Sequence, residues 1–211
     1  FVLTTNSLTA QQAEWCATDQ MLQEYFSANP ELETTFWEDQ AKLSQLPALK
    51  GAQNNKAPII TVPVVVHVIQ FNGSGNITKQ QIDDGIRILN EDFQKLNADT
   101  ASTRTVFRNI ANNSDNAVKA LSYWPSNQYL NVWLVNTINS GSTTGTILGY
   151  AQFPNSGNLS TYGLVCRNDR WGNIGTAAGN GGRTATHEVG HCFGLLHPFQ
   201  GSCGTSCNGS G

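Results

Sequence analysis

The most informative stretch of this chain is "THEVGHCFGLLHPF", residues 186–199. His187 and His191 are four residues apart, so both imidazoles project from one face of a helix and can bind one ion. Gly194 can take the left-handed conformation that ends a helix. The reversed chain then brings His197 back toward the same ion. The spacing therefore predicts a site with three histidine ligands.

Three histidines leave the fourth tetrahedral position for water, which is the layout of a catalytic zinc site. Glu188 points about 100° away from His187 around the helix, so it can act as the general base without being a ligand. A histidine pair at this spacing alone often occurs by chance on a helix surface. Here three of the four histidines lie in eleven residues, and a glycine falls where the helix must end. We therefore expect a catalytic Zn²⁺ site.

The region upstream of this helix alternates between strand and helix patterns. Thr78 and Gln81 have the spacing of a capping box, and apolar residues from Ile82 to Leu96 form one stripe that should pack on a sheet. The pattern predicts an α/β fold with a layered sheet and a central final helix. The expected elements are strand 59–70, helix 79–97, strands 129–138, 145–153 and 162–167, and a glycine-rich loop 172–182. The fourth histidine, His67, falls inside the first strand and is expected to be structural.

Residues 1–57 differ in character, with seven acidic residues, three lysines and no arginine. Apolar positions predict two short helices, at 19–28 and 31–46, with Asn29 as a cap before a proline. The polar stretch "PALKGAQNNKAP", residues 47–58, is typical of an exposed linker. We therefore divide the chain into 1–57 and 58–211.

Composition excludes two classes of function. Charged residues make up 13% of the chain and the net charge is -3, which disfavours an electrostatic nucleic-acid binder. No apolar run is long enough to span a membrane. The abundance of Asn, Thr, Ser and Gly is typical of many secreted proteins, so we expect secretion.

Five cysteines is an odd count, so in an oxidising compartment at least one stays free, binds metal or pairs outside this sequence. Cys192, inside the final helix, is expected to pack in the core. Cys203 and Cys207 are close enough for a small disulfide loop, although either could pair beyond Gly211. Cys166 has no predicted partner.

The motif HExxHxxGxxH resembles that of the metzincin metallopeptidases, and its surroundings narrow the match to the pappalysin family. The stretches that carry the resemblance are "VPVVVHVIQ", "ITKQQIDDGIRILNEDFQKLNAD", "YLNVWLVN", "LGYAQFP" and "GRTATHEVGHCFGLLHPFQGSC". The resemblance implies a zincin-like α+β subdomain, with a twisted mixed sheet, a backing helix and an active-site helix. It also implies extracellular cleavage of proteins or peptides, zinc and, in several members, structural Ca²⁺.

The chain departs from the family pattern in two places. The only methionine is Met21, whereas metzincins place a methionine turn after the third histidine. We therefore expect that turn, part of the specificity pocket and the calcium ligands in a C-terminal subdomain outside this chain. In addition, residues 99–122 lack the extra strand that the family usually has. These departures favour one alternative, a metal-binding fragment or interaction module without proteolysis. A metzincin of another family is a second alternative.

Cys16 lies in "WCATDQM", which resembles the prosegment cysteine motif of bacterial pappalysin-family zymogens, except that Ala17 replaces an expected glycine. The resemblance implies a cysteine switch, in which the Cys16 thiolate takes the fourth zinc position and displaces the water. An uncoordinated free thiol and a disulfide to a later cysteine are the alternatives. Because residues 1–57 lack arginine, members that cut beside arginine would leave activation to another protease.

Overall fold

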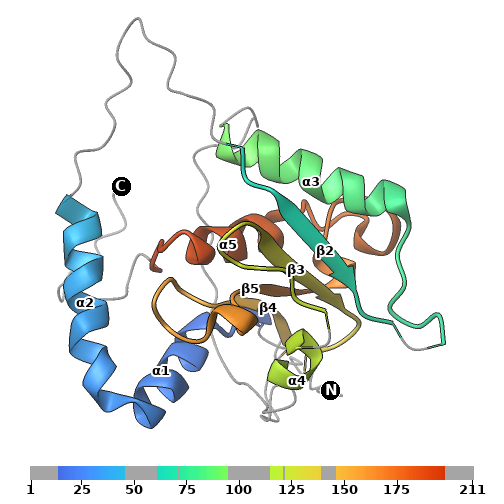
Figure 1. The fold of residues 1–211 in the computed structure, drawn as a ribbon. Helices are drawn as coiled ribbons and strands as arrows, with labels where there is room; N and C mark the ends of the chain where they lie inside the picture. The colour runs from blue at the N-terminus through green and yellow to red at the C-terminus, as the bar shows by residue number, and fades with distance from the viewer. Residues whose placement is uncertain are drawn as a thin grey trace, which may run out of the picture.

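The computed structural model describes residues 14–45, 61–70, 72–94, 115–120, 122–138 and 146–197. Its elements are β1 (Glu14–Cys16), α1 (Thr18–Ala28), α2 (Pro30–Gln45), β2 (Val64–Val68), α3 (Lys79–Phe93), α4 (Asp115–Ala120), β3 (Leu130–Val135), β4 (Thr146–Ala151), β5 (Gly163–Arg167) and α5 (Arg183–Cys192), with short 3-10 turns at Leu159–Thr161, Asn168–Arg170 and Gly175–Ala177 (Figure 1). Within these segments no helix combines the length and apolar character needed to cross a bilayer.

The strands form one mixed sheet in the order β1-β4-β5-β3-β2. Strands β2, β3 and β5 are mutually parallel, β4 runs antiparallel to β5, and β1 is parallel to β4. The predicted α/β class is confirmed, and the four predicted strands are present with narrower bounds. Strand β1 was not predicted, because three residues are too few for a period-two pattern.

One face of the sheet is covered by α3 and α5. Alternate residues of β2 and β3 point to this face, as expected for a strand, and they meet the apolar sides of both helices. The core there contains Ile77, Leu89, Leu130, Val132, Leu134, Ala151, Leu164, Cys166, Trp171, Ala185, Val189 and Cys192. This packing fixes α5 across the sheet, as Figure 1 shows.

Helix α3 also holds the loop that precedes α5. Thr78 caps α3 by accepting a hydrogen bond from the Gln81 backbone N–H at 3.2 Å. The Gln81 side chain turns toward the loop instead, where its amide donates to the carbonyls of Asn168 and Trp171 at 2.8 and 3.0 Å. The predicted apolar stripe ends early, since Phe93 is 47% exposed and packs against Phe193.

The opposite face of the sheet carries Trp133, Ile147, Tyr150 and Val165. Helix α4, which the sequence did not predict, places the Lys119 ammonium over the rings of Trp133 and Tyr150, at 5.4 and 5.0 Å from their centroids. On this face His67 Nε2 lies 3.0 Å from Asn131 Oδ1, and its ring stacks on Trp133. The prediction of a structural histidine is therefore confirmed.

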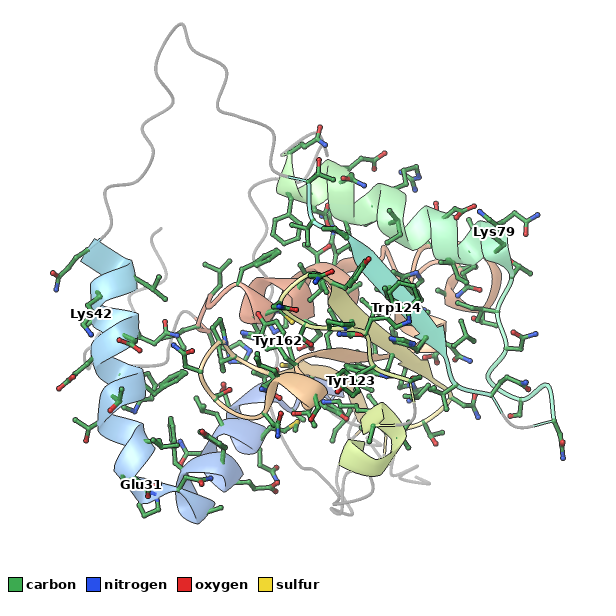
Figure 2. The ribbon with its side chains drawn as sticks, viewed as in Figure 1. Glu31, Lys42, Lys79, Tyr123, Trp124 and Tyr162 are labelled. Carbon is green, nitrogen blue, oxygen red and sulfur yellow. The ribbon has the colours of Figure 1, made fainter. Side chains whose placement is uncertain are left out.

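Helices α1 and α2 form a hairpin beside the C-terminal end of α5 (Figure 1). Leu22, Phe26 and Phe36 of the hairpin are buried with Phe153, which follows β4. On α2, Leu32 and Leu43 are 37% and 47% exposed, so the apolar side of this helix is only partly covered. Figure 2 shows Glu31 and Lys42 on the outer side of α2. The predicted linker 47–58, Leu46, Leu96, Cys203 and Cys207 lie outside the described residues.

Candidate metal centre

Helix α5 and the turn after it bring three histidines together. Gly194 has a φ of 85° and ends the helix, with its N–H donating to the His191 carbonyl at 2.9 Å. The chain then reverses and places His197 beside the helix. The Nε2 atoms of His187 and His191 lie 3.0 Å apart, and the Nε2 atom of His197 lies 3.0 and 3.1 Å from them. The three histidines that the sequence predicted to lie together therefore do so in the structure.

The other ring nitrogens indicate what this cluster can bind. Nδ1 of His191 lies 2.6 Å from the Leu195 carbonyl oxygen, and Nδ1 of His197 lies 2.9 and 3.0 Å from the two carboxylate oxygens of Asp19. These oxygens accept hydrogen bonds, so each Nδ1 carries the proton and each Nε2 presents a lone pair. Converging lone pairs fit a cation. Two nitrogens bound tetrahedrally to one zinc ion at about 2.0–2.1 Å lie roughly 3.3 Å apart, close to the observed spacing.

Cys16 approaches this cluster from the other end of the chain. Strand β1 pairs Cys16 with Gly149, and the Ala17 N–H donates to the Gly149 carbonyl at 3.1 Å. The Cys16 Sγ and one nitrogen from each of the three histidines all lie within 4.8 Å of one another. In the part of the chain that the structure describes, this is the single group of three or more such ligand residues with that spacing. Cys16, predicted as the fourth ligand, therefore lies beside the three histidines.

Glu188 is buried between α5 and β4, with 1% of its surface exposed. Its Oε2 accepts a hydrogen bond from the Thr18 hydroxyl at 3.1 Å and lies 3.4 Å from Cys16 Sγ. Thr18 in turn accepts from the Ala151 N–H at 2.8 Å. Gly149 makes room for this carboxylate, because a Cβ there would lie 2.9 Å from Glu188 Cγ.

Burial shifts the pKa values of the ionisable side chains at this centre. It raises the pKa of Glu188 to about 8, although hydrogen bonds from Cys16 and Thr18 act in the opposite direction. It lowers the pKa of His187 to about 4 and that of His191 to about 3. Both rings are therefore neutral near neutral pH, as metal ligation requires. Burial, and then the Glu188 charge, raise the pKa of the Cys16 thiol well above its ordinary value, an effect that a coordinated cation reverses.

Neighbouring side chains support the cluster. The Phe153 ring packs edge-on against the His191 ring, with centroids 5.2 Å apart. The Tyr162 hydroxyl donates to the Cys192 carbonyl at the end of α5, and Figure 2 shows Tyr162 beside that helix. Cys192 is buried in the core, as predicted, and Cys166 is buried on β5; both are free thiols, as is Cys16.

Sequence reasoning found the three histidines, Glu188 and Cys16, but it missed Thr18, Asp19 and Gly149. Thr18 and Asp19 follow Cys16 within three positions, where β1 ends and α1 begins. We call Cys16–Asp19 the junction. Its residues contact different parts of the centre: Cys16 meets the histidine cluster, Thr18 meets Glu188, and Asp19 meets His197. In the sequence, the signal that could have identified Thr18 and Asp19 was their position next to Cys16.

Known proteins resemble both the sequence and this arrangement. The family profile described as Pregnancy-associated plasma protein-A matches residues 112–210. The structure of Tannerella forsythia mature mirolysin in complex with a cleaved peptide is 31% identical, with a TM-score of 0.56, and the match covers 72% of this chain and 69% of that one. The chain belongs to the pappalysin family. This membership, together with the mixed sheet, confirms the zincin-like fold that the resemblance implied.

Other pappalysin relatives extend the comparison to the N-terminal segment. A Tannerella forsythia promirolysin mutant matches 87% of this chain and 69% of its own, at 28% identity and a TM-score of 0.62. An "Extracellular metalloprotease" of Verticillium alfalfae is 33% identical over 174 residues, and one of Pyricularia oryzae is 32% identical over 174 residues. These matches cover 74% and 78% of this chain, which spans 60% and 58% of the two relatives.

Proposed function

We propose that this chain belongs to a secreted zinc-dependent endopeptidase, held latent by its own prosegment. Residues 1–57 would be the prosegment with its linker, and residues 58–211 would begin the catalytic domain. The observation that carries the proposal is the convergence of three histidine Nε2 atoms within 3.1 Å, with a buried carboxylate alongside. The names of the relatives, extracellular metalloproteases, support hydrolysis and secretion.

His187, His191 and His197 would hold the zinc ion. When bound, zinc supplies a Lewis acid that activates water and polarises the scissile carbonyl. Glu188 takes the proton of the attacking water and then passes it to the leaving amine. Its position favours this role, because its Oε2 lies 3.4 Å from Cys16 Sγ, which is itself among the ligand atoms.

Cys16 would keep the enzyme latent by blocking the fourth zinc position. Its Sγ stands among the ligand atoms, on the side of the cluster next to Glu188, so a coordinated thiolate occupies the place of the water. Activation then requires removal of the junction, by another protease or by a second copy of the mature enzyme. Substrates would be proteins or peptides. Ca²⁺ and the C-terminal part of the protein remain expectations from the resemblance, since their residues would lie beyond this chain.

One set of variants tests the proposal, in the full chain and, where the parent protein is longer, in that protein. We expect about one bound zinc per chain and peptide cleavage that a zinc chelator abolishes. Glu188→Ala should retain zinc and lose cleavage by about 10²–10⁴-fold. Cys16→Ala should shorten the latent phase, whereas Cys166→Ala, which removes a buried thiol away from the cluster, should not.

The outcomes separate the parts of the proposal. Strong cleavage by Glu188→Ala would remove that residue from the mechanism. An unchanged latent phase in Cys16→Ala would rule out the thiolate block. Zinc binding without cleavage in every variant of the parent protein would instead support a metal-binding module.

A further inference from the structure

The His197 imidazole is supported by a residue from the N-terminal segment. Both Asp19 carboxylate oxygens lie within 3.0 Å of His197 Nδ1, although the two residues are 178 positions apart. The His197 side chain is 2% exposed and that of Asp19 is 29% exposed, so water competes little at the ring. This hydrogen bond fixes the ring orientation and keeps the lone pair of Nε2 directed at the cluster.

His191 shows the contrasting case. Its Nδ1 is held by the carbonyl of Leu195, which belongs to the turn that follows α5. That support remains whatever happens to residues 14–45. The support of His197 comes from Asp19 in the first turn of α1, and it leaves with that helix.

Resting on the zinc site proposed above, we propose that Asp19 is a positioning residue for His197, so that the latent chain binds its metal more tightly than the same site does without Asp19. The effect is separate from that of the thiol, because Asp19 contacts His197 at Nδ1 whereas the Cys16 Sγ lies among the ligand atoms themselves. The prosegment therefore has two roles at the centre. Cys16 blocks the position for water, and Asp19 completes the outer shell of the third ligand.

The test measures zinc affinity in the full chain by competition with a chromophoric chelator. Asp19→Ala should weaken zinc binding by about 10–100-fold, the usual effect of removing an outer-shell partner. Asp19→Asn keeps one acceptor oxygen, so its zinc affinity should lie between that of the unmodified chain and that of Asp19→Ala. The loss should persist in a Cys16→Ala background and disappear in a His197→Ala background, as coupling through that ring requires.

Two matched variants distinguish positioning from loosened packing. Glu24→Ala removes an exposed carboxylate from the same helix and should leave zinc affinity unchanged. Leu22→Val loosens the packing of α1 at a side chain buried among the aromatic residues of the hairpin, and it should also retain affinity. The Co²⁺ absorption spectrum should change in Asp19→Ala and not in either control.

Unchanged zinc affinity in Asp19→Ala would overturn this inference while leaving the zinc site intact. An equal loss in Leu22→Val would overturn it as well, because the effect would then belong to docking of the helix. Absence of zinc from the unmodified chain would overturn the proposed function itself, and the inference with it.

Discussion

The histidine side of the metal centre, His187, His191 and His197, is built from one helix and one turn, whereas the junction that faces it comes from a strand end about 170 positions earlier. The histidine side is held by covalent connection and by the core beneath α5. The junction is held by one parallel strand pairing, by Thr18 and by the aromatic hairpin behind it.

This difference explains how one chain can carry both a site and its block. Loss of the junction removes contacts at the sheet edge, where β1 is the terminal strand. The pairings among β2 to β5 and the core beneath α5 do not involve the junction, so we expect both to remain. Changes on the junction side should therefore release the site, while changes under α5 should damage it.

Phe36→Ala should give the largest effect on the junction side. Its ring is buried and packs against Phe26 at 5.3 Å and Phe153 at 5.8 Å. Removing it should weaken docking of the hairpin by about 3–5 kcal/mol. Limited proteolysis should then cut residues 14–45 faster while α5 stays protected.

The control for this prediction is Leu32→Ala, on the same helix but partly exposed, which should change stability by less than about 0.5 kcal/mol. Equal loss of protection in the hairpin and in α5 would contradict the separation of the two sides.

Gly149→Ala tests the contact surface between the two sides. An added Cβ would lie 2.9 Å from Glu188 Cγ and 3.1 Å from the Val165 carbonyl oxygen. The clash should cost about 1–3 kcal/mol and displace Glu188, so we expect cleavage to fall while zinc content stays unchanged. Thermal unfolding and zinc analysis measure the two effects.

Gly190→Ala is the matched control for that substitution. Among the described residues, a Cβ at this position on α5 would meet only Leu195, at an ordinary 3.5 Å. An alanine inside a helix should stabilise the chain by about 0.5–1 kcal/mol relative to glycine. A loss of cleavage equal to that of Gly149→Ala would show that the displaced carboxylate is not the cause.

The histidine side could be predicted because its geometry is local. A helical repeat and one left-handed glycine determine where three rings point, and Gly194 does adopt that conformation. The sheet was predictable for a similar reason, since each of the strands β2 to β5 is indicated by apolar residues that lie close together in the sequence. The burial of Cys192 followed from its place on the helix.

The junction could not be derived in the same way. Cys16 was expected only from a resemblance, and Asp19 and Thr18 became visible when β1 paired with β4 in a defined register. No local pattern specifies which strand a three-residue segment joins. Helix α4 was missed because six residues give less than two turns of periodicity.

Thr18→Val is the smallest predicted change and the one that tests the junction at a single hydroxyl. Thr18 is fully buried, and valine would leave the Ala151 N–H without that acceptor and Glu188 without that donor. We expect a loss of about 1–2 kcal/mol in the metal-free chain. Thr18→Ser, which keeps the hydroxyl, should recover most of it.

The pH dependence of this loss gives the sharper test. The pKa of Glu188 is raised to about 8 in the folded chain, so folding holds a proton that the unfolded chain releases near its ordinary value of 4.5. The contribution of Glu188 to the free energy of unfolding is therefore complete below pH 4.5 and is lost as pH rises through 8. The Thr18 hydrogen bond lowers the pKa of Glu188, so valine should raise it further. Chemical unfolding should therefore show a larger deficit above pH 8 than below it. A deficit independent of pH would mean that Thr18 acts on the Ala151 backbone alone.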